Sequence, residues 1–233
     1  MRTAEAALHQ NIRIGSYGGD VLASVPAGPV NFDFLLWGVA QNGQWGTQDH
    51  MADAEAVEAG VQFTKVPTKP WLRGGWFRGS GDEDNADGEH NTFFQVLPTP
   101  RVYAQFPFYN LMNSTDEFVQ IIDTPCKNLT LRSDLHWLQL TSNQEFWYQG
   151  GGAFDNKVFG YVGRTASGQS SFAMVADIAA NWQTTKTVGV NLYYAHAFGK
   201  SVVASIYPTD SDANYGYAEL VYRWGAATPP SAK

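Results

Sequence analysis

The sequence predicts an all-β protein, an antiparallel transmembrane β-barrel of about nine strands, and three observations lead to this fold class. The composition combines 14% aromatic residues and 23 glycines with only 16% charged residues, which favours strands over helices. Polar and apolar residues alternate along many segments, as they do in a strand whose two faces meet different surroundings. No stretch approaches the ~18 consecutive apolar residues of a membrane-spanning helix, a requirement that barrel strands do not share.

The N-terminal half of the chain carries four predicted strands, near residues 10–25, 30–43, 51–64 and 70–80. The first has a weak alternation. The second places Trp37 on the same face as Asp33 and Gln41, which also weakens its support. The third alternates apolar residues with Glu58 and Gln62, so it is predicted to have one apolar and one polar face.

The C-terminal half carries five predicted strands, near residues 116–124, 128–141, 170–182, 187–198 and 214–224. The first of these five has little support. The second has the clearest alternation, because Arg132, Asp134 and His136 share one face and leucines and Trp137 share the other. The last strand finishes in Trp224, and alternating residues that end in an aromatic are similar to the terminal strand of outer-membrane barrels.

The predicted connections differ in length in a regular way. Short ones alternate strictly with long ones; the short ones are 26–29, 65–69, 125–127 and 183–186, and the long ones are 44–50, 81–115, 142–169 and 199–213. A transmembrane barrel has this asymmetry, with tight turns at one end and long external loops at the other.

Four aromatic residues fall where strands meet the short turns: Phe63, Trp71, Trp182 and Trp224. We interpret them as a girdle at the membrane interface, where amphipathic rings are enriched. The alternative is that they are ordinary strand-end core residues of a soluble β protein.

Several classes of protein are disfavoured by the composition. A net charge of −7 argues against nucleic-acid binding, which uses clustered Lys and Arg. The single Cys126 excludes an internal disulfide, and the five histidines show no metal-ligand spacing with it. No nucleophile elbow or phosphate-binding loop occurs. We therefore expect no enzyme activity, no cofactor and no metal. The acidic segment 82–89 is either a solvated loop or a calcium site, and its spacing does not match the twelve-residue calcium loop.

Particular motifs carry a family resemblance. In order they are Asp33-Phe-Leu-Leu-Trp-Gly38, Gln44-Trp-Gly-Thr-Gln-Asp-His50, Val57-Glu-Ala-Gly60, Pro70-Trp-Leu-Arg73, Phe77-Arg-Gly-Ser-Gly-Asp82, Thr92-Phe-Phe-Gln-Val-Leu-Pro-Thr-Pro-Arg101, Phe106-Pro-Phe-Tyr-Asn110, Leu131-Arg-Ser-Asp-Leu-His136 and Trp147-Tyr-Gln-Gly-Gly-Gly-Ala153. This order of motifs resembles the alginate-export porin family over roughly residues 30–224. The block from 70 to 153 is the most specific part.

The resemblance implies an eighteen-stranded barrel in the cell outer membrane, with a basic lumen that conducts anionic alginate. The chain is similar to the second half of that barrel. The implied organisation is a truncated start at 1–9, a barrel portion at 10–225 and a flexible tail at 226–233. Because Met1 to Gln10 lacks the apolar core of a secretory signal, we expect the true N-terminus, and the N-terminal strands that complete the pore, to lie upstream. The implied partners are an anionic polysaccharide or small solute and outer-membrane lipid.

Five residues are candidates for contact with the solute: Arg73, Arg101, Arg132, Asp134 and His136. In a barrel the apolar face of 129–137 meets lipid, so Arg132, Asp134 and His136 are predicted to point into the lumen. On the strand 70–80, the apolar neighbours of Arg73 indicate that it also points inward, whereas Arg78 faces outward near the external rim. A soluble strand with the same residues in water is the alternative.

The connection 81–115 is unusually apolar, so we expect residues 92–110 to fold into the barrel and bring Arg101 near the pore. Packing over the barrel mouth or against a partner is the alternative. Two other functions stay open at this point. One is a soluble secreted β-rich protein, either a carbohydrate-binding module or a polysaccharide lyase, since Trp and Tyr also stack on sugars. The other is a structural barrel with a plugged lumen.

Overall fold

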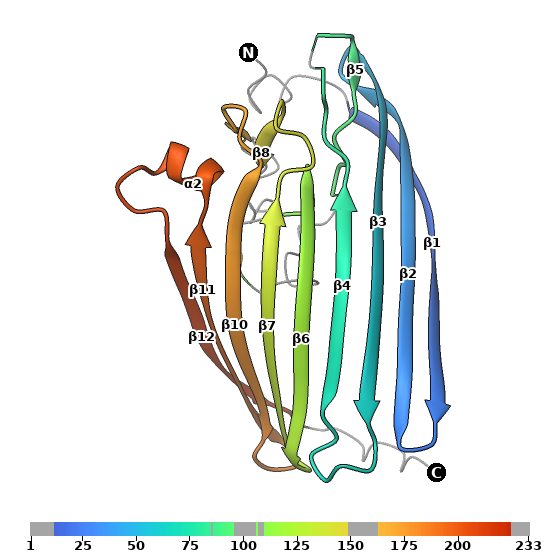
Figure 1. The fold of residues 1–233 in the computed structure, drawn as a ribbon, viewed down its shortest axis with the longest axis vertical. Coiled ribbons are helices and arrows are strands. Elements are labelled where there is room, and N and C mark those ends of the chain that lie inside the picture. Colours follow the sequence, from blue (N-terminus) through green and yellow to red (C-terminus); the bar gives the residue numbers. More distant parts are fainter. Residues whose placement is uncertain (1–11, 85, 96–105, 107–109, 149–162, 225–233) are drawn as a thin grey trace.

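A single large sheet dominates the computed structural model, which describes residues 12–84, 86–95, 106, 110–148 and 163–224 (Figure 1). Its nine long strands are antiparallel to their neighbours and follow one another in chain order. They are β1 (Ile12–Ala27), β2 (Val30–Trp45), β3 (Gln48–Phe63), β4 (Trp71–Gly79), β6 (Ser114–Cys126), β7 (Leu129–Gln139), β10 (Ser171–Gln183), β11 (Val188–Gly199) and β12 (Ala213–Tyr222). All nine predicted strands are confirmed. The predicted start at 1–9 and tail at 226–233 lie outside the described residues.

Three short strands and one helix were not predicted. They are β5 (Glu89–His90), which pairs in parallel with β3, β8 (Phe146–Tyr148), which pairs with β9 (Gly163–Thr165), and α2 (Ser201–Ile206). Each is too short for its period, two in a strand or 3.6 in a helix, to repeat often enough to be recognised in the sequence. All lie in or beside the connections at one end of the sheet (Figure 1).

The short turns lie together at the opposite end of the sheet (Figure 1). The β6–β7 turn is one of them, and the exposed Cys126 stands at its start. The prediction of a long connection at 44–50 is wrong. The ladder between β2 and β3 continues to the pair Trp45 and Gln48, which leaves a two-residue turn. Gly46 has a φ of 68°, the positive value that such a tight hairpin requires.

The two faces of the sheet have opposite character. The exposed face, defined by Leu36, Val57, Ile178 and Leu192, carries large apolar side chains that are 48–52% exposed. The buried face is defined by Asp134, His136, Asp177 and Tyr193, which are at most 5% exposed. The predicted faces of β7 are confirmed, because Trp137 is exposed whereas Asp134 and His136 are buried.

Two apolar clusters lie on the buried face toward the end that carries the long connections. The first contains Phe77 of β4, three alanines of β3 and Phe93. In the second, Val175 of β10 and Tyr193 of β11 belong to a cluster that includes Phe106. Phe93 and Phe106 both come from the β4–β6 connection, so the described part of this connection does fold onto the sheet.

Three of the four predicted girdle residues lie on the exposed side of the sheet, and one does not. Trp182 and Trp224 are 49% and 80% exposed. Trp71 instead points to the buried face, where its Nε1 donates a hydrogen bond of 2.6 Å to Asp33. An indole N–H that leaves water needs a partner, and a carboxylate supplies one here. The prediction that Trp71 belongs to the girdle is therefore wrong. None of the helices in the described part of the chain has the length and hydrophobicity needed to span a membrane.

Candidate functional site

Polar side chains form a row across the buried face, at right angles to the strands. Arg73 of β4 is paired with Gln120 of β6, Gln120 with Asp134 of β7, and Asp134 with Asp177 of β10. On the other side of Arg73 the row continues to Asp33 of β2. The row holds two charged clusters, one around Arg73 and one around Arg132.

The Arg73 cluster consists of Asp33, Glu58, Trp71 and Arg73. The guanidinium reaches both carboxylates, with Nε 3.2 Å from Asp33 and Nη2 2.7 Å from Glu58. It also lies 4.9 Å from the ring centre of Trp71, a distance at which a cation is attracted to the ring. Gly60 of β3 lies between Asp33 and Arg73 in the ladder. Its lack of a side chain allows these two residues to meet, since a Cβ there would lie 2.3 Å from Oδ2 of Asp33.

The Arg132 cluster consists of Asp116, Arg132, Asp134, His136, Asp177 and Tyr193. Both Nε and Nη2 of Arg132 donate to Oδ2 of Asp134, two residues along the same strand. The Tyr193 hydroxyl donates to Oδ2 of Asp177 at 2.8 Å. Nδ1 of His136 lies 2.9 Å from Oδ2 of Asp116, and both of these side chains are fully buried.

The predicted site residues fall into these clusters as far as they are described. Arg73, Arg132, Asp134 and His136 all lie on the buried face, and Arg101 lies outside the described residues. Each cluster holds more carboxylates than guanidinium groups. Arg73 and Arg132 are therefore held in ion pairs and do not stand as isolated positive charges. Their role in binding a solute stays a prediction.

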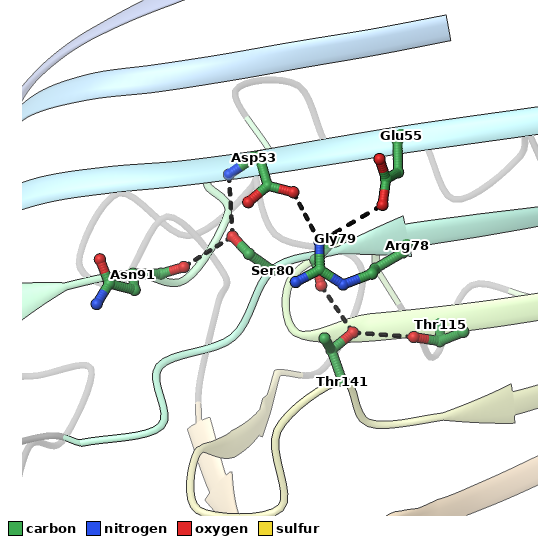
Figure 2. A network of polar contacts seen from close by, with 8 residues as sticks. All are labelled: Asp53, Glu55, Arg78, Gly79, Ser80, Asn91, Thr115 and Thr141. Atoms are coloured by element: carbon green, nitrogen blue, oxygen red, sulfur yellow. Dashed lines mark hydrogen bonds and ion pairs between the residues drawn. The ribbon is translucent and has the colours of Figure 1, made fainter. Parts of the chain in front are cut away.

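Arg78 lies on the exposed face, as predicted. It forms ion pairs with Asp53 at 2.7 Å and Glu55 at 3.6 Å (Figure 2). Beside it, the hydroxyl of Ser80 accepts a hydrogen bond from the backbone N–H of Asp53 and donates one to the carbonyl of Asn91 (Figure 2). This network ties the first residues of the β4–β6 connection to β3.

A third polar group lies in the connection that follows β7. The carboxylate of Glu145 is buried and accepts hydrogen bonds from Thr92, Tyr148 and the backbone of Phe146, at 2.7–3.1 Å. Burial raises the pKa of Glu145 above its ordinary value, and burial also raises the pKa of Tyr148. The tyrosine therefore stays a neutral hydrogen-bond donor.

The acidic segment 82–89 shows no shared ligand position among its described residues. Asp82, Asp84 and Asp87 each accept a hydrogen bond from a backbone N–H two residues further along. Side chains of this kind stabilise turns. Asp84 and Asp87 are exposed, as the solvated-loop interpretation expects, whereas Asp82 is fully buried.

Six residues of the two clusters were not singled out from the sequence as site candidates: Asp33, Glu58, Trp71, Asp116, Asp177 and Tyr193. Their partners lie on other strands, and the sequence separations reach 40 residues for Asp33 and Arg73. Alternation fixes the face on which a residue lies, but it carries no information about which residue lies opposite.

Comparison with known proteins gave one family. A model of the alginate export family matches residues 7–202 of the chain. The search of curated proteins found no match.

Proposed function

Because this chain belongs to the alginate-export family, we propose that it forms the wall of an outer-membrane channel through which an anionic polysaccharide such as alginate leaves the cell. The family is one of transport, and the all-β sheet is the kind of architecture from which a membrane barrel is made.

The observation that carries the proposal is the reversed polarity of the two faces. Val21 and Leu220 are 62% and 72% exposed, whereas Asp116, Asp134 and His136 are at most 3% exposed. In water this arrangement is unfavourable, because burial of apolar area stabilises a fold by roughly 25 cal/mol per Å² and these side chains forgo it. In a bilayer, lipid covers the apolar face. A soluble carbohydrate-binding module would instead bury its apolar face, so the observation favours the membrane protein.

Closure of the barrel is a separate part of the proposal. β1 and β12 are the edges of the described sheet, and nine antiparallel strands leave them running in the same direction. An unpaired backbone group in hydrocarbon costs several kcal/mol, so the edges need partners. We propose that an odd number of further strands, in the same antiparallel order, completes the barrel.

The β4–β6 connection is the proposed constriction. Phe93 and Phe106 lie on the buried face, which is the lumen side of the proposed barrel. A connection that enters the lumen narrows it and brings Arg101 toward the solute.

Planar lipid bilayers test this function directly. The detergent-purified protein, with the further strands that are proposed to complete the barrel, is expected to show discrete current steps, to be blocked by an oligomer of uronic acid, and to be blocked less by a neutral oligosaccharide of equal length. A heat-modifiable gel band without current would indicate a plugged structural barrel. A protein that stays monodisperse without detergent and shows no current would contradict the proposal.

Deletion of residues 92–110 tests the constriction within the same experiment. The shortened protein is expected to pass more current in each step, because the lumen loses its apolar filling. Unchanged conductance in a normally assembled deletion variant would place the connection outside the conduction path.

A further inference from the structure

We propose that Asp134, His136 and Asp177 form a binding site for a divalent transition-metal ion between β7 and β10. Each of the three residues offers one ligand atom, and these atoms lie within 4.8 Å of one another. All three side chains are buried. This inference rests on the contacts of these residues and does not depend on the proposed channel.

The atoms that lack partners identify the ligands. Oδ1 of Asp134, Nε2 of His136 and Oδ1 of Asp177 are buried and have no hydrogen-bond partner among the described residues. Buried polar atoms are nearly always paired, so each exception calls for an explanation. Three exceptions on three neighbouring side chains share one explanation, a cation that all of them bind.

The other polar atom of each ligand is held in place. Asp116 lies at Nδ1 of His136, which favours the tautomer that leaves the lone pair of Nε2 directed at the cation. Arg132 binds Oδ2 of Asp134, and Tyr193 donates to Oδ2 of Asp177. Metal sites in proteins are built in this way, with outer residues that orient the ligating atoms.

The electrostatics also favour a cation at this position. Asp134 and Asp177 are directly opposite one another in the ladder between β7 and β10, and like charges in this position are destabilising. The three carboxylates of the cluster exceed its one guanidinium by two charges when His136 is neutral. A divalent ion balances this difference.

The ligand types indicate the class of ion. One imidazole nitrogen and two carboxylate oxygens suit zinc, iron(II), manganese(II) or cobalt(II), whereas calcium and magnesium prefer ligand sets of oxygen alone. Three protein ligands leave coordination positions for water. Such an ion would join β7 to β10 directly and β6 through Asp116.

Cobalt(II) provides the probe, because its visible absorption bands report the ligand set. Untagged, chelator-treated protein is expected to bind one Co²⁺ with the bands of a mixed nitrogen and oxygen site, and to release it when Zn²⁺ is added. The variants His136→Gln and Asp177→Asn are expected to weaken binding at least 100-fold. Asp116→Asn and Tyr193→Phe keep all three ligands, and a loss of roughly 10- to 100-fold is expected from the weakened orientation.

Two matched variants serve as controls. Asp33→Asn removes a carboxylate from the Arg73 cluster, and His50→Gln removes a buried histidine that lies 2.9 Å from His90. Both are expected to bind Co²⁺ like the unaltered protein. The proposal is overturned if the unaltered protein binds no Co²⁺ at millimolar concentration, or if Asp116→Asn and Tyr193→Phe, folded by their heat-modifiable mobility, bind it with unchanged affinity and spectrum. Loss of binding in His50→Gln alone would place the ion elsewhere and would equally overturn it.

Discussion

The Arg73 and Arg132 clusters contain similar residue types but differ in how their carboxylates are paired. Both lie in one row on the buried face, and both set a single guanidinium among an excess of carboxylates. Arg73 reaches two carboxylates on two other strands and leaves none of its partners unpaired. Arg132 turns along its own strand to Asp134, and Asp177 is left to a tyrosine.

The residue types in a charged cluster therefore do not determine whether all of its carboxylates are paired. Gly60 leaves space between Asp33 and Arg73, so the ion pair forms across a strand that has no side chain at that point. The guanidinium of Arg132 donates to Asp134 on its own strand, and Asp177 accepts its hydrogen bond from Tyr193. The first cluster is complete as a structural ion pair, whereas the second retains acceptor atoms that can bind an ion.

The largest expected effect comes from removal of the guanidinium groups. Arg132→Met leaves fully buried carboxylates without a cation, and breaking a buried ion pair in this way costs about 3–5 kcal/mol of unfolding free energy. Arg73→Met should cost less, roughly 2 kcal/mol, because the side chains of Asp33 and Glu58 are 15% and 11% exposed to water whereas that of Asp134 is fully buried. Urea unfolding in detergent with a chelator, followed by tryptophan fluorescence, measures both. Equal losses would show that the two clusters do not differ as described.

Neutralising one carboxylate in each cluster should give effects of different sign. Asp33 accepts hydrogen bonds from both Trp71 and Arg73, so Asp33→Asn should lower the unfolding free energy by about 2 kcal/mol. Asp177→Asn relieves the repulsion from Asp134, and in chelator it should be neutral or stabilising. With Zn²⁺ present it should become destabilising relative to the unaltered protein. If Asp177→Asn in chelator lowered the unfolding free energy as much as Asp33→Asn does, the proposed difference between the two clusters would be contradicted.

Glu145 differs from the carboxylates of both clusters, because it is buried and accepts hydrogen bonds but has no guanidinium partner among the described residues. Its raised pKa means that the folded state favours the protonated form. The stabilisation is fully present below the ordinary value of 4.5 and is lost as pH rises through the raised pKa. The protection factors for hydrogen exchange of residues 142–148, in which the intrinsic pH dependence of exchange is divided out, should therefore fall between acidic and neutral pH. Glu145→Gln should remove this change, and pH dependence that persists in the variant would assign it to another group.

The smallest expected effect is on ion selectivity. Arg73→Gln and Arg132→Gln together should shift the permeability ratio only slightly away from anions. Each guanidinium is already paired, and charges in a wet pore are screened over about 8–10 Å. Reversal potentials in a salt gradient measure the shift. A large shift would show that these two arginines act as free charges in the pore.

Alternation of residue types predicted the faces of β4 and β7 and most of the nine strands, although its support was weak for β1, β2 and β6. This is because a period of two is a local property of the chain. The clusters could not be predicted in the same way. Asp177 lies 43 positions after Asp134 in the sequence, and only the ladder between β7 and β10 brings the two together. Trp71 was assigned wrongly for a related reason, since its direction is set by a carboxylate 38 positions away.

The position of Cys126 gives the protein a marker of sidedness within its own sequence. It is the single cysteine of the chain, its thiol is exposed, and it stands at the turn end, opposite the connections that carry β5, β8 and α2 (Figure 1). In a channel with its long loops outside, this thiol faces the periplasm. A maleimide that cannot cross the outer membrane should therefore leave it unlabelled in intact cells and label it once that membrane is opened.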